Sequence, residues 1–218
     1  NGDGEGSKLS PMELVERAID RDAKIAFVME FIGASIIGEA VLYAICLILT
    51  GDGNNGKSTF IDTVKSLFPK KAVASIAPQE WARIDFLAAF QGIRLNSCSE
   101  LPAREIIDNE SFKSVISGDT KTVRRLYGDP FELTFEAGNM FAGQKLPATR
   151  DMSKGFWRRV GPIEFLREFT DADRIIGLAK LLLEERPGIT RMALEAAARL
   201  QTNKAYTIPE STKKLKRQ

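Results

Sequence analysis

The feature that most constrains the fold of this 218-residue chain is a glycine-rich loop between two apolar segments. Its sequence, GDGNNGKS at 51–58, fits the pattern G-x-x-x-x-G-K-[ST] at every fixed position. An unbroken apolar run at 41–49 precedes it and predicts a strand buried on both faces, and the spacing over 58–68 predicts an amphipathic helix. Strand, loop and helix together predict a phosphate-binding loop in an α/β fold with a parallel sheet.

Each part of this loop has an expected role. Glycines let the backbone N–H groups point at phosphate oxygens, and the helix that follows directs its positive end at the same phosphates. Lys57 would reach the β- and γ-phosphates, and the Ser58 hydroxyl would bind Mg²⁺. We therefore expect ATP as the substrate and Mg²⁺ as the cofactor. The expected ATP-binding residues are Gly51, Asp52, Gly53, Asn54, Asn55, Gly56, Lys57, Ser58 and Thr59.

The rest of the chain predicts further elements around this unit. A helix begins near Ser10-Pro11 and closes near Gly33, strands follow at 93–98, 140–143 and 160–165, and a hairpin joins 122–127 to 131–135. Helices fill 171–200, interrupted by Pro187-Gly188. We expect a P-loop NTPase core with a central parallel sheet, a β-hairpin insertion and helical segments at both ends. The expected parts are a helical segment at 1–40, the ATPase core at 41–166, a helical segment at 167–200 and a basic tail or linker at 201–218.

Composition excludes several classes of site. Lys and Arg (31) barely exceed Asp and Glu (29), so any nucleic-acid contact must come from local clusters. The absence of histidine removes His-based catalysis and metal binding. Cys46 and Cys98 lack metal-ligand spacing and predict buried free thiols in a reducing compartment. The apolar stretch at 36–49 is too short to span a bilayer and contains Glu39, so we expect a soluble cytoplasmic protein without a membrane partner.

Five segments occur in a telling order: LTGDGNNGKSTF, RLNSCSE, FKSVISGDTKTVRRLYGDPFEL, GQKLP and GFWRRVGPIEF. This succession resembles the superfamily 3 helicases of the AAA+ type, in particular the D5-like and primase–helicase replication proteins of phages, plasmids and large DNA viruses. The resemblance implies an ATP-dependent DNA helicase or translocase that hydrolyses ATP between the subunits of a ring, a hexamer in the full protein. Its implied partners are single-stranded or forked DNA and a primase or polymerase module in the parent chain.

The same resemblance implies three further catalytic residues. Glu100, at the end of the strand at 93–98, would act as the base, as a partner of Mg²⁺ or as both, although the family often has two adjacent acids there. Gln144 stands where the family usually has Asn and would bind the γ-phosphate or the attacking water. Arg159, beside Arg158, would be an arginine finger supplied to a neighbouring subunit. The alternatives are a solvated strand-end glutamate, a polar strand end and surface arginines in a salt bridge.

The predicted hairpin would hold DNA. In the resembling helicases it projects into the channel of the ring, and cations on it can hold phosphates without reading sequence. An ordinary solvated hairpin is the alternative. Side chains alternate along a strand, so Lys121 and Arg125 would share a face and Arg124 would lie on the other. The expected DNA-binding residues are Lys113, Lys121, Arg124 and Arg125.

Two other functions stay open from the sequence. One is an ATP-gated oligomeric assembly or DNA-loading module with little unwinding activity. The other is a P-loop kinase that acts on a small molecule, which the hairpin and the paired arginines disfavour. Stimulation of ATP hydrolysis by single-stranded DNA would separate the helicase from the assembly module.

Overall fold

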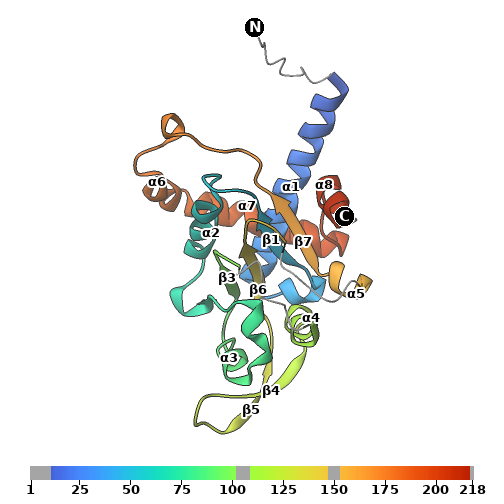
Figure 1. Cartoon of the computed structure of the whole chain (residues 1–218), viewed down its shortest axis with the longest axis vertical. Coiled ribbons are helices and arrows are strands. Elements are labelled where there is room, and N and C mark those ends of the chain that lie inside the picture. The colour runs from blue at the N-terminus through green and yellow to red at the C-terminus, as the bar shows by residue number, and fades with distance from the viewer. Residues whose placement is uncertain (1–10, 102–108, 147–152, 217–218) are drawn as a thin grey trace.

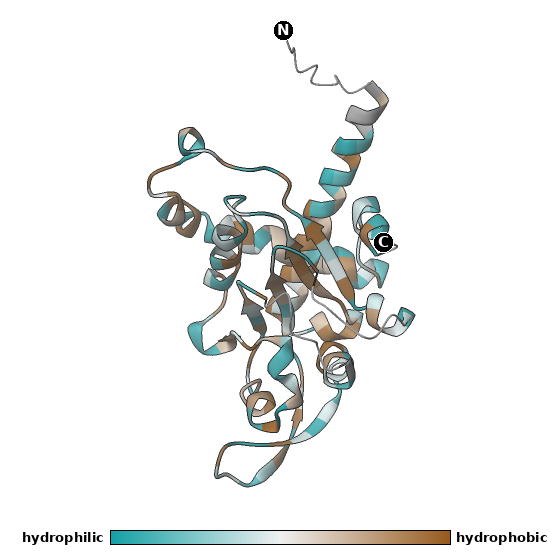
Figure 2. Ribbon diagram, viewed as in Figure 1, coloured by the Kyte–Doolittle hydropathy of each residue, from teal (hydrophilic) through white to brown (hydrophobic). Residues whose placement is uncertain are grey.

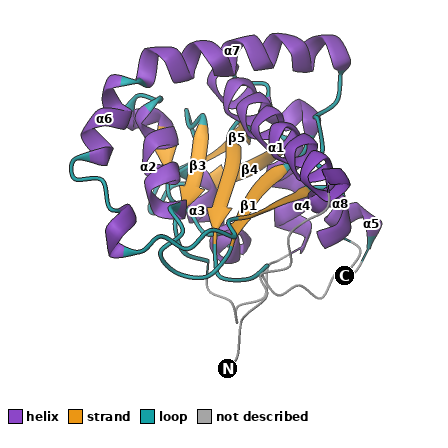
Figure 3. Cartoon of the chain, turned by 90° about the horizontal axis from the view of Figure 1, so that it is seen from above, coloured by secondary structure: helices purple, strands orange, loops and turns teal. Residues whose placement is uncertain are grey.

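The computed structural model describes residues 11–101, 109–146 and 153–216. A five-stranded parallel sheet forms its centre, and helices cover both faces (Figure 1, Figure 3). The strand order is β2–β3–β6–β1–β7. This arrangement confirms the predicted α/β class. The strands are β1 (Cys46–Thr50), β2 (Val73–Ala74), β3 (Leu95–Cys98), β6 (Gly138–Ala142) and β7 (Val160–Glu164).

Alternating side chains of β1 feed two separate apolar cores. Leu47 and Leu49 join one core, whereas Cys46 and Ile48 join the other. Because both faces of β1 are buried, its sequence is apolar without alternation; Figure 2 shows the hydrophobic strands at the centre of the molecule. The first core lies against α1 (Pro11–Ile37), α2 (Lys57–Ser66) and α7 (Arg186–Asn203), and the second against α3 (Ile84–Ala88), α4 (Asn109–Ser117) and α5 (Lys154–Trp157).

The register of the sheet decides what meets at each of its ends. β1 lies between β6 and β7, with Leu49 opposite Ala142 and Thr50 opposite Glu164. Since all five strands are parallel, their carboxyl ends lie at one edge, which we call the carboxyl edge, and their starts lie at the amino edge. The loop at 51–56 therefore shares the carboxyl edge with the residues that follow β3, β6 and β7.

The predicted hairpin is present and lies at the amino edge. β4 (Thr120–Arg124) pairs antiparallel with β5 (Pro130–Thr134), and Val123 lies opposite Phe131. β6 begins shortly after β5 ends, so the hairpin extends from the end of the sheet that is remote from the glycine-rich loop, as Figure 1 shows.

Two predicted boundaries near the N-terminus were wrong. The apolar run at 41–49 is not a single strand, because Ala40–Tyr43 forms the 3₁₀ helix η1 and Ala44 turns the chain with φ of 48°. This turn is only partly buried, with Leu42 exposed, yet its residues are as apolar as those of a buried strand. Gly33 does not end α1 but lies inside it, where a Cβ would overlap the carbonyl oxygen of Ala193 in α7. This glycine therefore serves close helix packing.

The C-terminal region also differs from expectation. Pro187-Gly188 lies in the first turn of α7, where proline is tolerated, and the break falls before it. The segment expected as a tail holds the end of α7 and the helix α8 (Glu210–Leu215), whose buried Thr212 donates a hydrogen bond to the Pro162 carbonyl of β7 (2.7 Å). The remaining helices are η2 (Lys70–Ala72), η3 (Pro78–Ala82), η4 (Asp171–Asp173) and α6 (Leu178–Glu184).

Both cysteines are free and buried, as predicted. Burial raises the pKa of Cys46 to about 12 and that of Cys98 to about 11, so both stay protonated at neutral pH. Within 11–101, 109–146 and 153–216, no helix is both long enough and apolar enough to cross a membrane.

Candidate functional site

The glycine-rich loop depends on backbone conformations that favour glycine. Gly51 has φ of 136° and Gly56, which precedes α2, has φ of 83°. A Cβ on Gly51 would also lie 2.5 Å from the carbonyl oxygen of Phe165. Asn54 has φ of 54°, which asparagine tolerates better than most residues. The loop is therefore tightly curled against the chain that leaves β7.

Lys57, the first residue of α2, turns back over this loop. Its ammonium donates to the carbonyl oxygens of Gly51 (2.6 Å) and Asp52 (2.9 Å) and to Asn55 Oδ1 (2.8 Å). Burial lowers the pKa of Lys57, and the nearby Asp52 opposes that shift. The amine is thus held at the mouth of the loop by oxygen atoms that phosphate oxygens could replace.

Asn55 ties the loop to the neighbouring strand. Its buried side chain donates from Nδ2 to the Phe165 carbonyl (3.2 Å) and accepts from Lys57. The residues that follow begin α2, where Ser58 is exposed and Thr59 is half-buried in the first turn. Ser58 thus lies at the positive end of a ten-residue helix, beside the loop.

A cavity of about 260 Å³ opens at this edge of the sheet, and sequence reasoning missed half of its lining. The missed wall is the segment 164–168, which leaves β7. Because β7 pairs directly with β1, its continuation must pass the loop, and the Phe169 amide donates to the Asn54 carbonyl (2.7 Å). The signal that could have revealed this wall was the strand at 160–165, because a parallel neighbour of the strand before the loop must continue past the loop. The lining consists of Thr50, Gly51, Asp52, Gly53, Asn55, Gln144, Glu164, Phe165, Leu166, Arg167 and Glu168.

Two predicted catalytic residues lie at the same edge. Glu100 follows β3 and Gln144 follows β6, and both side chains are exposed. The adjacent strands are joined beyond their ends, since the Leu101 amide donates to the Ala142 carbonyl (2.8 Å). The Gly51 amide in turn donates to the Gln144 carbonyl (3.3 Å). The structure therefore brings Lys57, Glu100 and Gln144 to one edge.

The paired arginines lie at the amino edge, across the sheet from the loop of their own chain. The Arg159 carbonyl accepts from the amide of Cys46, at the start of β1 (2.8 Å). The Arg159 guanidinium donates to Ser117 Oγ (2.9 and 2.8 Å) and to the Gly155 carbonyl (2.6 Å), and burial lowers its pKa. Arg158 is exposed. Arg159 therefore braces its own chain, and Arg158 faces solvent.

The hairpin cations differ in the same way. Lys121 is half-buried on the face of β4 that carries the buried Val123, whereas Arg124 is exposed on the opposite face, as predicted. Arg125 donates to Gln91 Oε1 (2.6 Å) and lies 5.6 Å from the centre of the Phe131 ring. Lys113 is half-buried on α4 and not on the hairpin itself. Of the four, Arg124 is therefore the most open to a ligand.

The carboxyl edge suits a phosphate-bound metal ion better than a metal held by protein alone. Among the described residues, no three or more Cys, Asp or Glu side chains form a metal-binding group. The glycine cradle, the Ser58 hydroxyl and the exposed Glu100 fit Mg²⁺ with phosphate oxygens as its other ligands. Ser58 and Glu100 are thus the side chains that would hold it.

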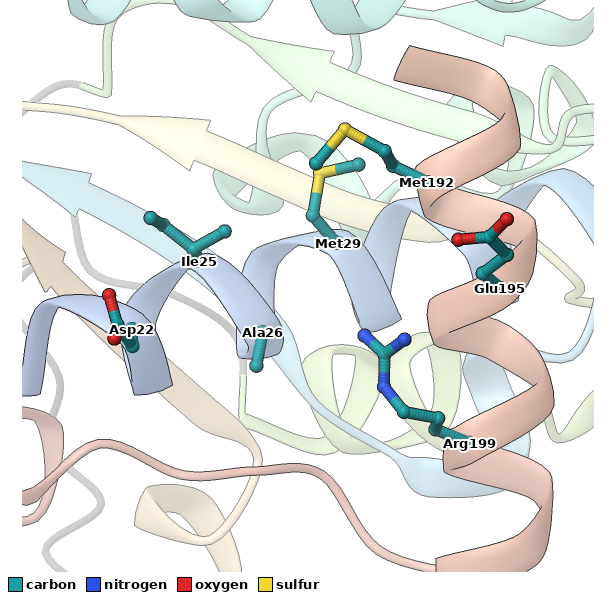
Figure 4. A pocket seen from close by; sticks show the side chains of 7 residues that line it. All are labelled: Asp22, Ile25, Ala26, Met29, Met192, Glu195 and Arg199. Carbon is teal, nitrogen blue, oxygen red and sulfur yellow. The ribbon is translucent and has the colours of Figure 1, made fainter. Parts of the chain in front are cut away.

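A second cavity, of about 250 Å³, lies between α1 and α7 (Figure 4). Met29 and Met192 face each other across it, and Glu195 and Arg199 line it from α7. None of the predicted catalytic residues lines this cavity, so it is separate from the loop.

Residues 49–159 match a family whose description reads only "family of unknown function", DUF5906. The matched stretch extends from the end of β1 to Arg159 and includes the loop, Glu100, the hairpin and Gln144.

One curated relative and two solved structures give the context of this match. A candidate helicase of Acanthamoeba polyphaga mimivirus, L207/L206, is 30% identical over 135 residues, which cover 56% of this chain and 13% of that protein. Two apo structures of the NrS-1 C-terminal region superpose with TM-scores of 0.66 (14% identity, 92% of this chain, 50% of that one) and 0.62 (17%, 88% and 49%). At these identities the two structures show a shared fold. The chain spans about half of those structures and a small part of the viral protein.

Proposed function

The chain belongs to the DUF5906 family, whose function is unknown, and from its site we propose that it is the ATPase motor domain of a DNA helicase or translocase. The observation that carries this proposal is that Lys57, Glu100 and Gln144 lie at the same carboxyl edge of the sheet as the glycine-rich loop. Similarity to the viral candidate helicase supports the class of activity. The fold, with β1 between β6 and β7, is compatible with an AAA+-type superfamily 3 domain.

The residues of the carboxyl edge divide the chemistry of hydrolysis among them. Lys57 exchanges the carbonyl oxygens of Gly51 and Asp52 for phosphate oxygens, and the start of α2 adds its positive end. Ser58 and Glu100 would hold Mg²⁺, which would supply positive charge to the phosphates. Glu100 accepts a proton from the attacking water, and the Gln144 amide orients that water or the γ-phosphate.

The positions of the arginines favour catalysis between subunits. Neither arginine reaches the loop of its own chain from the opposite edge of the sheet, but a neighbour in a ring could present one there. Arg159 uses its guanidinium to hold Ser117 and Gly155, so we propose Arg158 as the finger in place of the expected Arg159. A ring, a hexamer in the full protein, with single-stranded or forked DNA in its channel and a primase or polymerase module in the parent chain, belongs to the same proposal.

The test is ATP hydrolysis by the purified chain with and without single-stranded DNA. We expect DNA to stimulate hydrolysis and Arg158→Ala to lower it by roughly 10³-fold, the scale of an arginine finger. Mixing Arg158→Ala with Lys57→Ala should restore part of the activity, because some interfaces then combine an intact loop with an intact arginine. Arg159→Ala should instead lower the melting temperature.

Two outcomes would redirect the assignment. Rescue by mixing that requires Arg159 rather than Arg158 would return the finger role to Arg159. Hydrolysis that neither DNA nor either arginine variant changes would contradict the motor, and nucleotide-dependent oligomers would then indicate an assembly module.

A further inference from the structure

The tip of the hairpin holds a tyrosine in a conformation that tyrosine disfavours. The Gly128 amide donates to the Arg125 carbonyl (2.9 Å) and closes a tight turn, in which Tyr127 has φ of 60°. Positions of this kind in turns usually carry glycine or asparagine, because a Cβ is strained there. Tyr127 therefore makes folding of the turn less favourable than glycine would.

Nothing in the described chain compensates for this strain. The Tyr127 side chain is 99% exposed and Leu126 beside it is 72% exposed, whereas Phe169, the next most exposed aromatic residue described, is 40% exposed. Aromatic residues normally contribute to stability by burying their rings. A strained backbone around an unburied ring points to a ligand that covers the ring.

The rest of the hairpin holds this ring in a fixed place. Val123 and Leu133 are buried on the inner face, which packs on α3, and Arg125 is bound to Gln91. The tip thus projects from the amino edge on a braced support (Figure 1). The exposed Arg124 lies just before the turn and gives the tip a cation for a phosphate.

We propose that Tyr127 stacks on a base of single-stranded DNA while Arg124 contacts an adjacent phosphate, which rests on the proposed function. An aromatic ring beside a cation on a stiff element is the combination that binds single strands without reading their sequence, since every base has a flat face. Stacking at the tip would let the hairpin grip a base as well as the charged backbone. The ring, rather than the cations alone, then distinguishes a strand with bases from one without.

The experiment measures binding of the chain to a labelled oligothymidylate and to an abasic strand of equal length, by fluorescence anisotropy. The wild type should prefer the strand with bases by about tenfold, the scale of one stacked base. Tyr127→Ala and Tyr127→Gly should remove that preference, Tyr127→Phe should keep it, and the neighbouring control Leu126→Ala should change it less than about twofold. Tyr127→Gly should also raise the melting temperature, because glycine adopts φ of 60° without strain.

The outcomes separate this inference from the proposed function. If the wild type and Tyr127→Ala bind both strands alike, with DNA-stimulated hydrolysis intact, the stacking role is overturned and the motor stands. If the wild type binds neither strand and DNA leaves hydrolysis unchanged, the DNA motor fails and the inference with it. A Tyr127→Ala variant that shifts the sedimentation of the chain but not its preference for bases would identify Tyr127 as a contact between copies, which also overturns stacking.

Discussion

The two edges of the sheet fix their candidate site residues by different means. At the carboxyl edge, backbone geometry and short hydrogen bonds place each group, as the φ of Gly51 and the three oxygens around Lys57 show. At the amino edge, neighbours in sequence differ in their contacts: Arg159 is half-buried and bound to Ser117 while Arg158 is exposed, and of the two exposed residues Arg124 and Arg125 it is Arg125 that is bound to Gln91. A site that depends on backbone conformation requires particular residues, such as glycine, and so leaves a motif in the sequence. A site that depends on which side chains are free of other contacts leaves no such motif.

The largest effect should come from the lysine of the loop. Lys57→Ala removes the loop cation that we propose binds the phosphates, so ATP hydrolysis should fall at least about 100-fold. Lys71→Ala, an exposed lysine beyond α2, is the matched control and should hydrolyse ATP at the wild-type rate. Steady-state phosphate release measures both. Equal rates for Lys57→Ala and the wild type would show that the loop does not act on nucleotide phosphates.

A smaller effect is expected on stability, where alanine substitutions at two glycines of the same loop should differ. Gly51→Ala places a Cβ against the Phe165 carbonyl at a φ of 136°, which should cost roughly 2–3 kcal/mol of stability. Gly53→Ala meets no atom within 4 Å and should leave stability near that of the wild type. For a domain of this size the first change corresponds to a fall of about 5–10 °C in melting temperature.

The variants Gly51→Ala and Gly53→Ala test whether backbone geometry holds the glycine-rich loop in place at the carboxyl edge. Scanning calorimetry gives both melting temperatures, and nucleotide-free protein isolates the structural effect. Equal stability of the two variants would mean that the curl of the loop is not needed for the fold, and that the contrast between the edges is weaker than the conformation of Gly51 indicates.

The sequence predicted the fold well where burial and pattern coincide. The strands β3, β6 and β7 and the hairpin appear within about three residues of their expected bounds, because apolar runs and turn residues mark them directly. The sequence prediction failed at η1, because η1 shares one apolar run with β1 and the same pattern fits both structures. It also missed α8, because that helix is too short and polar to show a helical hydrophobic periodicity. The division into a core and flanking segments stays a prediction.

The candidate site was predictable to a similar extent. Spacing predicted the loop, and the resemblance to the superfamily 3 helicases predicted Glu100 and Gln144, whose catalytic roles stay a prediction. The wall formed by Glu164–Glu168 was missed because these residues carry no motif and reach the cavity only through the pairing of β7 with β1. The different surroundings of Arg158 and Arg159 depend on Ser117, which is distant in sequence and gives no local signal.

The smallest expected effect concerns the two hairpin arginines. Arg124→Ala should lower the slope of log affinity against log salt for single-stranded DNA by about 0.7, the share of one phosphate contact, and leave the melting temperature unchanged. Arg125→Ala should leave the slope unchanged, because that guanidinium is engaged with Gln91 and the Phe131 ring, and should loosen the hairpin on α3 instead. Anisotropy titrations at several salt concentrations measure both slopes. Equal slopes for the two variants would mean that the hydrogen bond to Gln91 does not keep Arg125 from DNA, and that Arg125 leaves Gln91 when DNA binds.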